Sequence, residues 1–156
     1  MKGVILEKGI ENFTKLNLFL PAIKEDICSY NWLITDIDSD YSSDSLVEKG
    51  YEFLSGEAFV ELIKNDEYKF VWGVFSAFSK DVSLDEILSN GIPFADGYTG
   101  FWKSTVSLQN SLAITELVLW DGMLAMIISC EEDVINKFLA FYSSGKDLEE
   151  YNKSLL

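Results

Sequence analysis

Apolar and polar residues follow one another along this chain in segments whose lengths suit short strands and helices. The clearest pattern spans residues 116–128, where two apolar runs flank Asp121-Gly122, a residue pair that favours a tight turn between antiparallel strands. Both runs are apolar at successive positions, so each strand needs cover on both of its faces. We therefore predict a β-hairpin covered by helices, by another sheet layer or by a second copy of the chain.

Three further segments, 3–6, 27–37 and 68–78, have the aromatic and β-branched composition of strands. In the third segment, alternation with a period of two places Phe70 and Trp72 on one face and Phe75 on the other. Both faces of this strand carry large apolar side chains. We therefore expect this strand in the middle of a sheet that is covered on both faces, rather than at an edge with one face exposed to solvent.

Capping residues followed by apolar residues at helical spacing predict three helices. Ser55 can cap a helix that runs to Lys64, and Ser83 begins a capping box before a helix that ends at Asn90-Gly91. A second capping box is predicted at Ser129, before a helix that stops near Gly145.

Residues 10–20 form a possible fourth helix, ended by Pro21. Leu16, Leu18 and Leu20 also alternate as in a strand, so the period alone does not decide this segment. Residues 92–110 contain Pro93 and scattered glycines and predict a loop or a glycine-turned hairpin. Together these elements predict an α+β fold with an antiparallel or mixed sheet that includes the C-terminal hairpin, with about four helices packed on it. The length suits one domain over residues 1–156.

The composition restricts the functions that this fold can have. The net charge is −14, from 26 acidic residues against 12 lysines, and the chain contains neither arginine nor histidine while being 48% hydrophobic. Such a chain folds and carries its charge on its surface, which disfavours nucleic acid and anionic membranes as partners. The apolar runs are too short for a signal peptide or a membrane span, so we expect a cytoplasmic protein. Cys28 and Cys130 should then be reduced, as small buried residues.

The missing histidine removes the usual serine and cysteine triads and most zinc sites. Gly97-Tyr98-Thr99-Gly100 lacks the remaining residues of either nucleotide-binding glycine motif. We therefore expect no catalytic residues, no cofactor and no enzymatic activity.

An acidic segment, residues 36–48, is the sharpest local feature. Asp36, Asp38 and Asp40 match the first three ligand positions of a calcium loop, but Tyr41 stands where that loop needs glycine and Val47 where it needs glutamate. We therefore predict no metal site here. A solvated loop is one interpretation, and a contact surface for a basic protein is the other. If the segment is a contact surface, the partner-binding residues are Asp36, Asp38, Asp40, Tyr41, Asp44 and Glu48.

A group of aromatic residues in the irregular segment is the second candidate site. Tyr98, Phe101 and Trp102 could fold inward as a separate core, or could be exposed for binding. If the group is exposed, Tyr98 and Trp102 belong to the partner-binding residues as well. Alternatively, the group could line a small-molecule pocket with a carboxylate such as Asp96 or Asp121.

The order of these elements resembles a family of small uncharacterised bacterial cytosolic proteins, some of them similar in kind to immunity proteins that neutralise toxins. The resemblance rests on Tyr30-Asn31-Trp32 after an early helix, on the helix around residues 59–63 before the strand 68–78, and on the closing hairpin with its helix. It covers residues 1–142, except that 92–110 departs from the pattern, and it assigns no functional residue.

The leading hypothesis is a non-enzymatic protein-interaction module with an acidic surface, of the kind that neutralises a basic, nuclease-like toxin. One alternative is a small-molecule-binding protein or a carboxylate-dependent enzyme with an aromatic-lined pocket. Another is a homo-oligomer in which the two-sided hairpin meets its symmetry mate.

Overall fold

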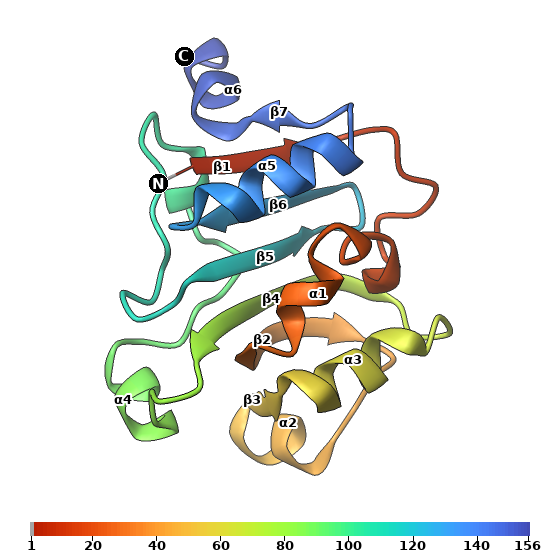
Figure 1. Ribbon diagram of the computed structural model, residues 1–156, viewed down its shortest axis with the longest axis vertical. Helices are drawn as coiled ribbons and strands as arrows, with labels where there is room; N and C mark the ends of the chain where they lie inside the picture. The colour runs from red at the N-terminus through yellow and green to blue at the C-terminus, as the bar shows by residue number, and fades with distance from the viewer. Residues whose placement is uncertain (1) are drawn as a thin grey trace.

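The computed structural model describes residues 2–156. Its centre is an antiparallel seven-stranded sheet with the order β3-β2-β4-β5-β6-β1-β7 (Figure 1). This confirms the predicted α+β class and the antiparallel form of the sheet. The strands are β1 (Lys2–Leu6), β2 (Tyr30–Ser39), β3 (Tyr51–Ser55), β4 (Phe70–Ser79), β5 (Thr115–Trp120), β6 (Leu124–Ser129) and β7 (Lys146–Asp147).

The described residues form six α-helices, two more than the sequence predicted, because several are only one or two turns long. Short 3-10 turns η1 (Leu16–Leu18), η2 (Pro21–Ile23) and η3 (Gly100–Trp102) accompany them. None of the helices in residues 2–156 has the length and apolar content needed to cross a membrane. The α-helices are α1 (Lys24–Ile27), α2 (Asp44–Lys49), α3 (Gly56–Lys64), α4 (Leu84–Ser89), α5 (Glu132–Phe141) and α6 (Leu148–Ser154).

One face of the sheet is covered by α1, α3 and α5, which lie in front of the strands in Figure 1. The core on this side is rich in aromatic rings. The ring of Phe59 on α3 lies 4.6 Å from that of Trp32 and 5.9 Å from that of Phe75, between centroids. The indole N–H of Trp32 donates to the carbonyl of Ile27 at 3.0 Å, which joins α1 to the sheet.

The opposite face is covered mainly by the irregular segment 92–114, together with α4 and α6. Phe101 from this segment and Leu148 from α6 are buried against the sheet. The hairpin is covered on both faces, as predicted, since Leu117 points into the helix-side core and Val118 into the other. The chain supplies this cover itself, so the hairpin needs no second copy to bury it.

Several local signals in the sequence are confirmed by the backbone. Asp121 and Gly122 have φ values of 51° and 62°, the left-handed conformation that this turn requires. Ser83 and Glu86 form the predicted capping box, and Ser55 accepts from the N–H of Ala58 at the start of α3.

The predicted helix over residues 10–20 is wrong. The side-chain oxygen of Asn12 accepts from both the N–H and the hydroxyl of Thr14, which makes a local turn. The chain then forms η1 and η2, and buries Leu16 and Leu20 in the helix-side core. Burial of these leucines, not helical periodicity, explains their spacing.

The capping box predicted at Ser129 is also wrong, because Ser129 is the last residue of β6. Its hydroxyl lies 2.8 Å from that of Thr115, and α5 begins without a side-chain cap. Cys130 is exposed and Cys28 is partly buried, so the expectation that both are buried does not hold. Phe70 packs on the same side as Phe75, opposite to the simple alternation, because the β2–β4 register shifts near this end.

We predict that Gly56→Ala destabilises the protein strongly. A Cβ at position 56 would lie 2.4 Å from the carbonyl oxygen of Ile27 and 2.6 Å from the Cα of Cys28, both of them backbone atoms that cannot turn away. The expected loss is roughly 1–3 kcal/mol of unfolding free energy, the usual cost of overpacking, measured by urea denaturation. The neighbouring exposed Glu57→Ala is the control, with a loss of less than about 1 kcal/mol. Equal losses in the two variants would contradict the prediction.

Candidate functional site

The acidic segment begins with a β-bulge at Asp36. The β2–β4 register passes from Thr35 opposite Val74 to Asp38 opposite Trp72, which leaves one extra residue in β2. Asp36 has a φ of 48°, a conformation that aspartate adopts more readily than most residues. Its carboxylate accepts from the N–H groups of Ala95 and Asp96 at 2.7 and 2.9 Å. Asp36 therefore anchors the irregular segment to the sheet.

Two further predicted site residues, Asp40 and Tyr41, also hold local structure. The carboxylate of Asp40 accepts from the N–H of Lys69 at 2.7 Å, and the hydroxyl of Tyr41 donates to Glu52 at 2.7 Å. The Tyr41 ring packs 5.0 Å from that of Tyr68, between centroids. Burial, and then the bond to Glu52, raise the pKa of Tyr41 above its usual range. Tyr41 thus positions this loop and exposes only part of its surface.

The side chains of the remaining acidic residues make no such hydrogen bonds within residues 2–156. Asp44 and Glu48 lie four residues apart on α2, which Ser43 caps and Gly50 ends with a left-handed φ of 76°. Both are exposed, as is Asp38 on β2. Within residues 2–156, no ion pair with a lysine involves any carboxylate of the 36–48 segment. These charges are therefore uncompensated at close range.

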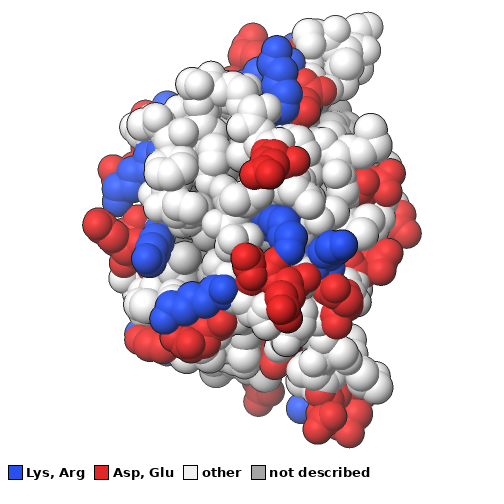
Figure 2. Space-filling model, turned by 90° about the vertical axis from the view of Figure 1, so that its right-hand side faces the viewer, with Lys and Arg blue, Asp and Glu red and all other residues white. Residues whose placement is uncertain are grey.

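A hollow of about 370 Å³ lies between α2 and the end of β2, and we call it the acidic hollow. It has both polar and apolar walls, since α2 contributes Leu46 and Val47 while Asp36 and Tyr41 come from β2 and the loop after it. Val47 is 76% exposed, which is unusual for a valine. Figure 2 shows the side of the molecule at the right of Figure 1, where acidic side chains lie in the lower half and along the right-hand edge, with several lysines among those of the lower half.

The predicted aromatic group folds inward. Trp102 lies 5.2 Å from Trp120, and Tyr98 lies 4.6 Å from the fully buried Phe101, between ring centroids. These rings pack against β5 and β6 as part of a second core. Asp36 joins this group to the acidic hollow through its bonds to residues 95 and 96. A binding role for Tyr98 and Trp102 stays a prediction, supported only by their partial exposure.

The sequence analysis missed Glu116, the most unusual ionisable residue of the structure. It is completely buried in β5, and its carboxylate accepts from the N–H of Gln109 at 3.0 Å and from that of Asn110 at 3.2 Å. Burial raises its pKa to about 7, against the lowering effect of these two bonds. The signal was a single charged residue inside an apolar strand predicted to be covered on both faces.

Buried hydroxyl groups lie near Glu116 on the same face of the sheet. Ser76 on β4 stands directly opposite Glu116, and Thr35 on β2 is diagonal to Ser76. Neither hydroxyl oxygen has a hydrogen-bond partner. Glu116 combines a raised pKa with neighbouring hydroxyls, as a catalytic carboxylate would. It has no exposed surface at which a substrate could meet it, so its role is to hold residues 109 and 110.

No group of three or more histidine, cysteine, aspartate or glutamate side chains in residues 2–156 is arranged to hold a metal ion. In comparisons with known proteins, no family model, curated protein or solved structure matches the chain.

The raised pKa of Glu116 predicts a pH-dependent stability. Because its pKa is 4.5 ordinarily and about 7 in the folded protein, the folded state binds more protons between these values. Stability from this residue is therefore complete below about pH 4.5 and is lost as the pH rises to 7. As the pH rises through this range, the wild type should lose roughly 2–3 kcal/mol of unfolding free energy relative to the Glu116→Gln variant. Urea denaturation at several pH values measures it, and a pH-independent difference would refute it.

Proposed function

We propose that the protein is a non-enzymatic interaction module that binds a basic protein partner at the acidic hollow. The observation that carries this proposal is the set of exposed carboxylates without ion pairs around the hollow. Seven acidic side chains elsewhere in residues 2–156 pair with lysines, as Glu132 does with Lys2 at 2.6 Å, and others do not, whereas all five acidic residues of the 36–48 segment lie close together in sequence without such a pair. Exposed charges of one sign attract a partner of the opposite sign and speed its association.

The residues of the acidic segment 36–48, which contributes most of the walls of the hollow, divide into two roles. Asp36, Asp40 and Tyr41 keep the loop and the bulge in place through the hydrogen bonds described above. Asp38, Asp44 and Glu48 contact the partner's basic side chains, since none of their carboxylates has a hydrogen-bond or ion-pair partner within residues 2–156. Val47 supplies an exposed apolar contact between these charges, where burial strengthens binding most.

For the partner we propose a toxin of the nuclease kind, with this protein as its immunity protein. A nuclease carries a basic surface to hold phosphates, and an acidic inhibitor competes for that surface. The support comes from charge complementarity alone. Glu116 gives no reason to prefer an enzyme, because its carboxylate is sealed from solvent.

We predict that the triple variant Asp38→Asn, Asp44→Asn, Glu48→Gln weakens binding of basic ligands. Octalysine serves as the first probe, titrated into isotope-labelled protein while amide chemical shifts are recorded. Shifts should concentrate in residues 36–50, and the variant should bind about tenfold more weakly at low salt, since each neutralised charge contributes a fraction of a kcal/mol. High salt should weaken binding to the wild type.

The matched control neutralises three exposed carboxylates elsewhere: Asp85→Asn on α4, Glu132→Gln on α5 and Glu150→Gln on α6. It changes the net charge equally and should bind octalysine nearly as the wild type does. In capture from extracts of the native host, a basic protein should be retained by the wild type and this control and lost from the triple variant. Equal weakening in both variants, or shifts spread over the whole surface, would overturn the proposal.

A further inference from the structure

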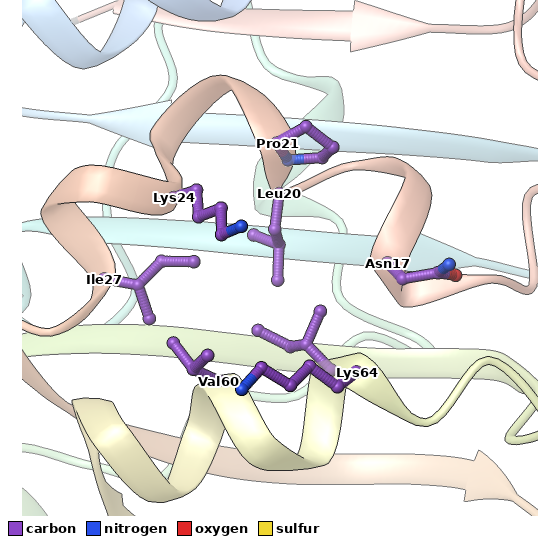
Figure 3. Close-up of a pocket in the computed structure, with 8 residues that line it drawn as sticks. Asn17, Leu20, Pro21, Lys24, Ile27, Val60 and Lys64 are labelled. Carbon is purple, nitrogen blue, oxygen red and sulfur yellow. The ribbon is translucent and has the colours of Figure 1, made fainter.

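A second hollow lies on the helix-covered side of the molecule, and we call it the lysine groove. It has a volume of about 250 Å³ and runs between the segment 17–27 and α3. Figure 3 shows its walls, with Leu20 and Ile27 on one side and Val60 on the other. On the side of the segment 17–27, the groove is bordered by the short elements η1, η2 and α1 rather than by one regular helix.

The floor of the groove is apolar. Leu20 and Ile27 are each only 2% exposed, and Val60 and Ile63 are partly buried residues of the helix-side core. This surface would bind a small apolar group of a ligand, because binding removes that group from water. The volume is slightly below the ~300 Å³ at which typical small-molecule pockets begin, so it suits a short ligand.

Two lysines flank this apolar floor from opposite walls, Lys24 from α1 and Lys64 from α3 (Figure 3). The chain has only 12 lysines against 26 acidic residues, so two lysines that line one groove, with no acidic residue among its lining side chains, are unusual for this surface. Lys64 pairs with Glu61 at 2.7 Å, while Lys24 makes no ion pair within residues 2–156.

The nearest acidic residues do not cancel the charge of Lys24. Asp26 on α1 is engaged by Lys137 of α5 at 3.0 Å. Glu25 and Asp26 line a neighbouring hollow, which shares Pro21 and Lys24 with the lysine groove but faces α5. Lys24 is therefore the cation available at the groove, and Lys64 is a second one that can exchange Glu61 for a ligand at small cost, because exposed ion pairs contribute little.

We propose that the lysine groove binds a small amphiphilic carboxylate, such as a free medium-chain fatty acid. The apolar chain lies along Leu20, Ile27 and Val60, and the carboxylate accepts hydrogen bonds from the ammonium groups of Lys24 and Lys64. An amine of the same length is rejected, because its charge matches that of the two lysines. This site is independent of the acidic hollow, and the two proposals fail or succeed separately.

The test uses octanoate as the probe, at concentrations at which it does not form micelles, with binding followed by methyl and amide chemical shifts. Shifts are expected at residues 20, 27, 60 and 63. Octylamine should bind at least about tenfold more weakly, and acetate, which has the head group alone, should give no saturable shift. Anionic phospholipid vesicles should not bind, since the groove is too small and the whole surface too acidic for a membrane.

Two variants make the test specific. Lys24→Gln with Lys64→Gln should weaken octanoate binding about tenfold, while Lys80→Gln with Lys103→Gln makes the same charge change away from the groove and should leave binding unchanged. Val60→Trp should abolish binding by filling the groove, with its fold checked by circular dichroism. Equal binding of octanoate and octylamine, shifts outside the groove, vesicle binding, or an unaffected Lys24/Lys64 double variant would each overturn the proposal.

Discussion

Both faces of the central strands are apolar, and the rest of the structure follows from the need to cover both. Amphipathic helices cover one face, because a helix satisfies its own backbone hydrogen bonds and presents a continuous apolar stripe. The irregular segment 92–114 covers the other and lacks such internal bonding. Its backbone groups need partners from elsewhere, since unpaired buried groups are costly. Glu116 and Asp36 supply them, from β5 and from the bulge in β2.

This arrangement explains why the acidic residues differ so much in environment. Some begin helices, as Glu57 and Asp85 do, where their charge complements the helix dipole. Others, Asp36 and Glu116, accept hydrogen bonds from irregular backbone. Burial of Glu116 disfavours its charged form and so raises its pKa. Asp38 and Glu48 have neither role, and Asp44, which begins α2, pairs with no lysine within residues 2–156. Their neighbours in sequence line the acidic hollow, while the lysine groove lies on the helix-covered side.

The elements that could be predicted were those specified by neighbouring residues. The Asp121-Gly122 turn needs left-handed backbone at both positions, and Ser83 finds its capping partner three residues away at Glu86. The predictions failed where a distant partner competed. Ser129 has the spacing of a helix cap, but its hydroxyl bonds across the sheet to Thr115. Residues 10–20 have helical spacing, but burial of Leu16 and Leu20 is satisfied without a helix.

The candidate sites show the same division. By itself, the sequence determined the acidic segment, the absence of histidine and arginine, and the two-sided hairpin, since composition and local pattern contain them. Tertiary structure alone decided which carboxylates hold other parts of the chain, because their hydrogen-bond partners can be far away in sequence, as Asp96 is from Asp36, 60 positions apart. It likewise decided the burial of Glu116 and the placement of Lys24 and Lys64 at one groove, since these lysines are 40 positions apart in sequence and α1 packs beside α3 only in the folded chain.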